Sequence, residues 1–146
     1  MTEIRSLRND LTFGLTKEID LVEHLERVLC PIYSETHFIN TKDLYNDEYC
    51  SYDFEGDVNK THIEVKSRRN TKYQYATTII PVHKIQETDK KQVFVFYFTD
   101  QICYIEYNQQ LFSTFNTRMI KVFRQGRYDP PTLHYEIPVN LLINFL

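Results

Sequence analysis

The sequence lacks the motifs and long apolar runs that mark several large classes of protein. It contains no Walker loop and no GxGxxG or GxSxG motif, so nothing in it favours a nucleotide-driven motor, a nucleotide cofactor or a serine hydrolase. No segment approaches the roughly 18 apolar residues of a membrane span. The N-terminal stretch MTEIRSLRND also lacks the apolar run of a signal peptide. We therefore expect a protein without a membrane segment.

Cysteine and histidine pairs are also missing. The three cysteines, Cys30, Cys50 and Cys103, are widely spaced and form no CxxC pair, which argues against a disulfide framework or a thiolate zinc site. The five histidines show no HxH or i, i+4 spacing, which argues against zinc bound by imidazole. Reduced thiols are typical of an intracellular protein, located in the cytoplasm, the nucleoid or the nucleus.

The chain has no excess of positive charge, since its formal net charge is −3. A dedicated nucleic-acid coat protein would be basic overall, so that role is not expected. A nucleic-acid enzyme is still compatible with this charge, because metal ions and a local basic patch offset acidic site residues. With 146 residues, 42% hydrophobic and 25% charged, and no linker-like segment, the sequence predicts a single folded domain over residues 1–146.

A helix pattern followed by several strand patterns defines the expected fold. Apolar residues at helical spacing predict a helix over residues 16–29, stopped at Pro31. Two runs, 50–55 and 61–67, flank a turn-rich segment and predict a β-hairpin. The apolar run 92–99 predicts a strand buried on both faces. Further strands are expected over 75–82, 102–107, 119–123 and 133–137, with a short helix over 111–115. This order predicts an α+β or α/β fold whose sheet is backed by the first helix.

The hairpin has a register that its own alternation defines. If its strands pair symmetrically about the boundary between Val58 and Asn59, Asp53 lies opposite Glu64. Side chains alternate across a strand, so one face is apolar and the other is charged. A slip of one residue would expose the apolar set, so the pattern fixes the register. The apolar face holds Tyr52, Phe54, Ile63 and Val65, and the charged face holds Asp53, Glu64 and Lys66.

The charged face has the residue types of a metal site that acts on phosphodiesters. Two carboxylates directly opposite on one face repel each other, and a divalent cation between them removes that penalty. A site with few carboxylates suits Mg²⁺ or Mn²⁺, and Lys66 would stabilise phosphate charge or activate a water. A solvated hairpin face with a Glu–Lys pair is the alternative interpretation. Asp57 competes for the first acidic role, but it lies in the predicted turn, where Asp is common for local reasons, so Asp53 is preferred.

The segments YDF and IEVKSR, with the turn between them, resemble the core of the PD-(D/E)XK nuclease superfamily. Glu64-Val65-Lys66 matches the E-x-K tripeptide, and Asp53 matches the preceding acid, although Tyr52 stands where the eponymous pattern has proline. The resemblance covers residues 13–84. It implies a restriction-endonuclease-like fold, in which helices flank a mixed central β-sheet with an αβββαβ core.

The resemblance also implies an activity and a set of site residues. The implied activity is hydrolysis of DNA phosphodiester bonds with Mg²⁺ or Mn²⁺, by an endonuclease rather than an exonuclease, and a homodimer is possible. Asp53, Glu64 and the carbonyl of Val65 would hold the metal, Lys66 would assist the water, and Glu18 would complete the site through a water or a second metal. Two other interpretations stay open: a catalytically inactive nuclease-fold module that binds nucleic acid or protein, and an aromatic-rich β-protein that serves in assembly.

A local basic stretch follows the E-x-K tripeptide directly. Its side chains are interleaved with Tyr73 and Tyr75 and are expected to grip a phosphate backbone, with salt-sensitive binding. The segment TTIIPVHK comes next and carries further polar candidates. The predicted substrate-binding residues are Arg68, Arg69, Lys72, Thr78 and Lys84.

Overall fold

The computed structural model describes residues 21–47, 50–121, 126 and 129–145. Its first described element is a helix over residues 21–33. The helix does not stop at Pro31, as the sequence predicts, but ends at Ser34, whose φ of 56° is left-handed. A proline so close to the end of a helix removes a single backbone hydrogen bond, which the rest of the helix tolerates. Glu18 lies outside the described residues.

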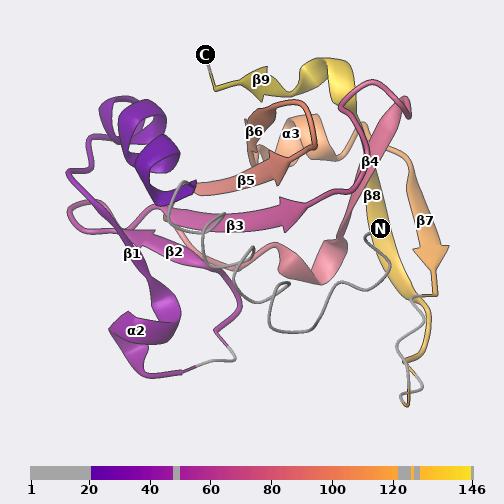
Figure 1. Ribbon diagram of the computed structural model, residues 1–146. Helices are drawn as coiled ribbons and strands as arrows, with labels where there is room; N and C mark the ends of the chain where they lie inside the picture. The colour runs from indigo at the N-terminus through magenta and orange to yellow at the C-terminus, as the bar shows by residue number, and fades with distance from the viewer. Residues whose placement is uncertain (1–20, 48–49, 122–125, 127–128, 146) are drawn as a thin grey trace.

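Six strands form one mixed sheet (Figure 1). All neighbouring strands are antiparallel except β3 and β5, which are parallel. The mixed sheet agrees with the expected fold class. In sheet order the strands are β1 (Phe38–Asn40), β2 (Phe54–Gly56), β3 (His62–Ser67), β5 (Gln92–Tyr97), β6 (Ile102–Glu106) and β9 (Ile143–Asn144).

The connection from β3 to β5 differs from the expected αβββαβ core. Residues 68–91 contain a strand, β4 (Thr77–Pro81), and a single 3₁₀ turn, η1 (Val82–Lys84), where that core has an α-helix. β4 pairs with β8 (Thr132–Pro138), which pairs with β7 (Thr117–Ile120), and the three form a second, antiparallel sheet. The other short helical elements are α2 (Thr41–Tyr45), α3 (Gln109–Phe112) and η2 (Val139–Leu141).

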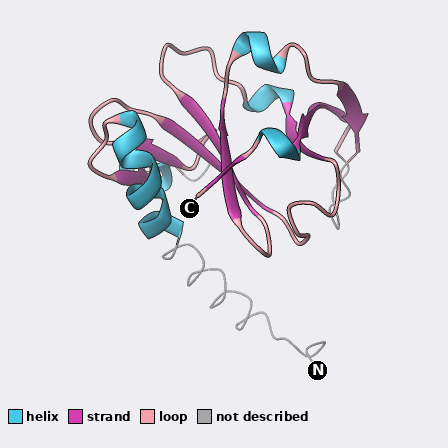
Figure 2. Cartoon of the chain, turned by 90° about the horizontal axis from the view of Figure 1, so that it is seen from above, coloured by secondary structure: helices cyan, strands magenta, loops and turns pink. Residues whose placement is uncertain are grey.

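The main sheet is covered on both faces, as the apolar run of β5 predicts. Val93 and Val95 pack with the helix of residues 21–33, whereas Phe94 and Phe96 pack with the second sheet and α3. In Figure 2 the long helix lies on one side of the crossing strands and several short helices lie on the other. On β3, Ile63 belongs to the helix side. Because side chains alternate along a strand, Glu64 faces the second-sheet side.

A buried carboxylate closes the turn between β2 and β3. Glu35, only 6% exposed, accepts hydrogen bonds from the backbone N–H groups of Val58, Asn59 and Thr61 at 2.7–3.0 Å, and from the Thr61 hydroxyl at 2.6 Å. Gly56 lies against this carboxylate so closely that an added Cβ would come within 1.9 Å of it. The local sequence therefore folds into a hairpin with a rigid closed end.

None of the helices among the described residues combines the length and the apolar composition that crossing a membrane requires.

Candidate active site

The predicted register of the hairpin is confirmed. Phe54 pairs with Ile63, and Glu55 pairs with His62. Asp53, the residue before β2, does not follow this register, because its N–H donates to the carbonyl of Ile63, the partner of Phe54, at 2.8 Å. The predicted opposition of Asp53 and Glu64 is therefore not a strand pair, although both residues lie at the open end of the hairpin.

Tyr52 does not lie on the apolar face where the alternation places it. Its ring stacks on His62, with the centroids 3.8 Å apart, and its hydroxyl donates to Glu55 at 2.6 Å. The reason is that β2 begins only at Phe54, so the alternation does not extend back to Tyr52. Burial lowers the pKa of His62, and its Nδ1 is buried with no hydrogen-bond partner among the described residues.

The carboxyl group of Glu64 acts on that of Asp53. Asp53 accepts a hydrogen bond from the N–H of Val65 at 2.8 Å. Burial, and then the charge of Glu64, raise the pKa of Asp53 to about 6, although the Val65 N–H and Lys84 act in the opposite direction. Two acids that compete for ionisation in this way are typical of a functional site.

Two lysines compensate the charge of Glu64. The Nζ atom of Lys66 lies 3.0 Å from Oε2 of Glu64, and Nζ of Lys84 lies 3.2 Å from the same oxygen. Glu64 itself is only 7% exposed. Lys66 comes from β3 and Lys84 from η1, so the connection that follows the E-x-K strand brings a second cation back to the same carboxylate.

The pair Asp53 and Glu64 meets the minimum that Mg²⁺ requires from a protein. Mg²⁺ is commonly held by one or two carboxylates, with water and substrate phosphate at its remaining positions. The described residues contain no group of three or more His, Cys, Asp or Glu side chains placed to hold a metal ion. Other ligands would have to come from a carbonyl such as that of Val65, from water or from substrate.

The other predicted acids lie elsewhere. Asp57 accepts hydrogen bonds from the N–H groups of Thr36 and His37 and from the Thr36 hydroxyl, and these bonds lower its pKa far below the usual range. It therefore stabilises the loop before β1 at the closed end of the hairpin. Glu18, outside the described residues, cannot be placed.

The predicted substrate-binding residues separate into different environments. Lys84 lies at the carboxylates, and Arg69 is exposed beyond the end of β3. Arg68 instead joins β3 to β4, since its Nε donates to the Thr78 hydroxyl at 3.1 Å and its Nη2 to the carbonyl of Ile79 at 2.5 Å.

Lys72 is not available to a substrate at this place. Its side chain is buried, 2% exposed, and its Nζ donates to Oδ1 of Asn144 at 2.7 Å and to the carbonyl of Leu142 at 3.3 Å. Lys72 therefore holds the C-terminal segment against the loop after β3.

A cleft of about 350 Å³ opens beside Lys66 and Lys84. We call it the lysine–histidine cleft. The sequence did not single out its other polar residues, and Asp129, Thr132 and His134 come from a segment distant from β3 without a shared motif. Alternation along β8 separates His134 from its apolar neighbours, but nothing in the sequence links that position to β3. The residues that line the cleft include Lys66, His83, Lys84, Asp129, Thr132 and His134.

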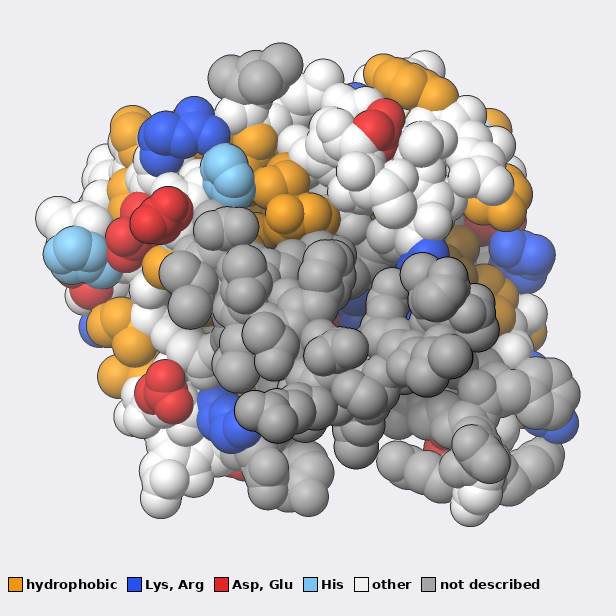
Figure 3. All heavy atoms as spheres, viewed as in Figure 1, with side chains coloured by type: hydrophobic (Ala, Val, Ile, Leu, Met, Phe, Trp, Pro, Cys, Tyr) orange, Lys and Arg blue, Asp and Glu red, His pale blue; other side chains and the backbone are white. Residues whose placement is uncertain are grey.

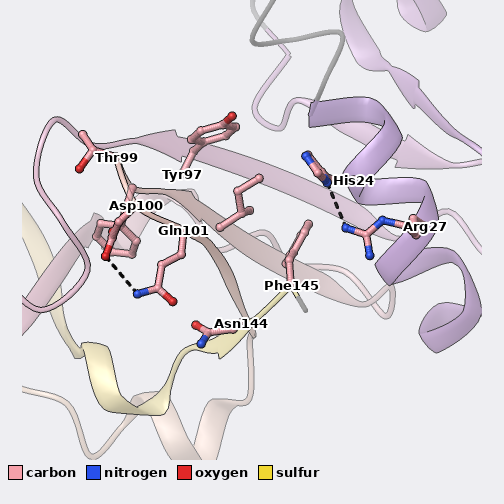
Figure 4. Close-up of a pocket in the computed structure, with 10 residues that line it drawn as sticks. His24, Arg27, Tyr97, Thr99, Asp100, Gln101, Asn144 and Phe145 are labelled. Carbon is pink, nitrogen blue, oxygen red and sulfur yellow. Dashed lines mark hydrogen bonds between the residues drawn. The ribbon is translucent and has the colours of Figure 1, made fainter.

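A larger cavity, of about 500 Å³, lies away from the carboxylates between the long helix, the β5–β6 turn and the C-terminal segment (Figure 4). Its polar side chains are engaged with one another. Arg27 and His24 are hydrogen-bonded at 3.1 Å, and Gln101 donates to Asp100 at 3.3 Å.

Figure 3 shows one face of the molecule, on which the visible acidic and basic side chains of the described residues lie in separate places and form no continuous basic surface.

Comparison of the chain with protein-family models, curated proteins and solved structures found no match.

Proposed function

We propose that this protein is a metal-dependent nuclease with a restriction-endonuclease-like fold, which hydrolyses phosphodiester bonds in DNA inside the cell. The observation that carries the proposal is the interaction of the Asp53 carboxyl group with that of Glu64, which both Lys66 and Lys84 pair with. An endonuclease acting as a homodimer would place two such sites on the two strands of a duplex.

Each residue has a role that its surroundings support. Asp53 and Glu64 would hold Mg²⁺ or Mn²⁺, together with the carbonyl of Val65, and the bound metal would supply Lewis-acid activation of the phosphate and of a water. Lys66 is held within 3.0 Å of Glu64, a position from which its ammonium group can stabilise charge on the phosphate or orient the attacking water. Lys84 would bind a phosphate oxygen.

The proton on Asp53 links pH to metal binding. A carboxyl whose pKa is raised to about 6 must release its proton before it binds a cation. We therefore expect Mg²⁺ affinity and cleavage to rise as the pH increases through about 6.

The test is cleavage of plasmid, single-stranded and branched DNA with Mg²⁺ or Mn²⁺. Glu64→Gln should reduce the rate by about 10³-fold, because it removes a metal ligand, and Lys66→Gln by about 10²-fold. A matched control is the ion pair between Lys91, the residue before β5, and Glu106 on β6, whose charged atoms lie 3.4 Å apart. Lys91→Gln and Glu106→Gln should leave the rate within about twofold, since exposed ion pairs contribute little.

Metal-dependent cleavage that survives Glu64→Gln and Lys66→Gln would contradict the site. If the wild type cleaves none of these substrates and calorimetry detects no Mg²⁺ or Mn²⁺ binding, the chain is instead a catalytically inactive module.

A further inference from the structure

The face of β3 that carries Glu64 continues across β2 and β1. His62, two residues before Glu64, points to the same side of the strand, and it pairs with Glu55, which in turn pairs with Ile39. Among the described residues, the apolar core between the main sheet and the second sheet contains no residue of β1, β2 or β3. This part of the face therefore carries side chains that are not needed for that core.

Two tyrosine hydroxyls converge on the buried carboxylate of this face. The hydroxyls of Tyr45 and Tyr52 each donate to Oε1 of Glu55 at 2.6 Å, and Glu55 is buried. The hydrogen bond to Glu55 raises the pKa of Tyr45, and burial, followed by the bond to Glu55, raises the pKa of Tyr52. Both hydroxyls therefore stay protonated at neutral pH and keep these bonds.

The short helix α2 holds the ring of Tyr45 in place beside β1 and β2 (Figure 1). At its first residue, the N–H of Thr41 donates to the carbonyl of Asp53 at 2.9 Å, and the Thr41 hydroxyl donates to the carbonyl of Tyr52. At its last residue, the Tyr45 hydroxyl is bonded to Glu55. Both ends of α2 are thus tied to the segment that contains Asp53. Tyr45 is nevertheless 52% exposed, which leaves its ring open to a ligand.

The charges of this face favour an uncharged ligand at Tyr45. Its carboxylates outnumber its cations, because Asp53, Glu55 and Glu64 share two lysines, both of which pair with Glu64. A nucleobase is planar and uncharged, and every base offers a face that stacks on an aromatic ring. The bases of a duplex are already paired and stacked, so a base that reaches such a ring has to be unpaired.

We propose that the ring of Tyr45 is a stacking platform for an unpaired nucleobase of the substrate strand, next to the phosphodiester at Asp53 and Glu64. The proposal rests on the proposed nuclease function, because that function supplies the strand. It narrows the substrate to DNA with unpaired nucleotides beside the cleaved bond. Since stacking tolerates any base, the platform adds affinity without sequence preference.

The experiment titrates the full chain, in EDTA and without metal, with two uncharged probes. 2′-Deoxyadenosine carries a base, whereas 2-deoxyribose is the sugar alone, and the carboxylates repel neither. Tyrosine ring signals are followed by NMR. We expect deoxyadenosine to shift the signals of Tyr45 and to leave unchanged those of Tyr73, which is 66% exposed and lies over Nζ of Lys72 in the loop after β3. Deoxyribose should shift neither.

Variants separate the ring of Tyr45 from its hydroxyl. Tyr45→Ala removes the ring and should weaken deoxyadenosine binding about tenfold, within the range for one base on an aromatic side chain. Tyr45→Phe keeps the ring and should stay within about threefold of the wild type. Tyr73→Ala is the matched control and should bind as the wild type does. If Tyr45→Ala fails to fold, Tyr45→Leu, which is apolar but has no ring, takes its place.

A competition experiment tests whether the base has to be unpaired. Oligothymidylate should displace deoxyadenosine from Tyr45, and the same oligomer paired with oligoadenylate should not. Displacement by neither, or by both equally, would contradict the assignment to an unpaired base of the strand.

Three further results would overturn the proposal: deoxyadenosine that leaves the Tyr45 signals unchanged, deoxyadenosine that shifts Tyr73 as strongly, or binding by folded Tyr45→Ala equal to wild type. The outcome is distinct from that of the cleavage assay. Nucleoside binding at Tyr45 without DNA cleavage would keep the base site and overturn the nuclease, and cleavage without nucleoside binding would do the reverse.

Discussion

The two ends of the β2–β3 hairpin carry acidic residues in opposite environments. At the closed end, the Glu35 carboxylate has four hydrogen-bond donors at 2.6–3.0 Å. Burial opposes its ionisation, but the bonds from Thr61, Asn59 and Val58 outweigh burial and lower its pKa. At the open end, Asp53 faces Glu64 and its pKa rises to about 6. A carboxylate with a full set of hydrogen-bond donors stabilises a fold, whereas a carboxyl group whose pKa is raised by burial and a neighbouring acid is typical of a functional site.

The largest expected loss in the free energy of unfolding comes from Gly56→Ala at the closed end of the hairpin. The new Cβ would lie 1.9 Å from Oε2 of Glu35, so the carboxylate would have to leave its four donors. We expect a loss of about 3 kcal/mol or more in the free energy of unfolding, measured by urea denaturation. The same substitution in a Glu35→Ala background should be much less damaging, because the clash is gone. Equal losses in both backgrounds would show that Gly56 is needed for another reason.

Glu35→Gln should have a smaller effect, of about 1–3 kcal/mol, because the amide group turns one acceptor into a donor facing backbone N–H groups. The pH dependence of this stability difference shows whether the ionised carboxylate of Glu35 is its cause. Because the folded-state pKa of Glu35 is lowered, its contribution is complete above the ordinary value of 4.5 and is lost as the pH falls below it. The difference between wild type and variant should therefore shrink in acid. Glu23→Gln, at an exposed helix position, is the control and should leave the stability unchanged.

Asp53→Asn should act in the opposite direction and stabilise the metal-free chain. The folded-state pKa of about 6 exceeds the ordinary value of 3.8, so stability from this group is complete below 3.8 and is lost as the pH rises through 6. At pH 7.5 the variant should be more stable by about 1–2 kcal/mol, with almost no difference at pH 4, and it should lack the proposed nuclease activity.

Asp57→Asn is the matched control at the closed end. It removes the charge from a carboxylate bonded to Thr36 and His37, so it should destabilise the chain at pH 7.5. If both aspartate variants change stability in the same direction, the contrast between the two ends is wrong.

The local part of this architecture was predictable from the sequence. The alternation within residues 54–55 and 62–63 determined the pairing of Phe54 with Ile63 and of Glu55 with His62, because only one register buries the apolar set. The buried β5 was predictable from its continuous apolar run. Tyr52 was placed wrongly because alternation holds only inside a strand, and the chain bends before Phe54.

The rest depends on contacts between segments that are distant in sequence. Lys72 belongs to a basic run that resembles a substrate-binding loop, yet its partners Leu142 and Asn144 lie at the far end of the chain. The second sheet and the position of His134 likewise arise from pairing of β4 with β8. Residue type and spacing carry no signal for such pairings, so the position of His134 in the same cleft as Lys66 was not predictable.

The pairing of β4 with β8 also has a consequence for the order in which the parts of the candidate site form during synthesis. Among the described residues, β4 pairs with residues 134–138 of β8, and pairing over so long a separation forms late because the intervening chain must be closed into a loop. A ribosome-bound chain that ends before β8 would carry the Asp53–Glu64 hairpin without the wall formed by Thr132 and His134. We therefore expect nascent and truncated chains to acquire the acidic pair before the lysine–histidine cleft beside it is complete.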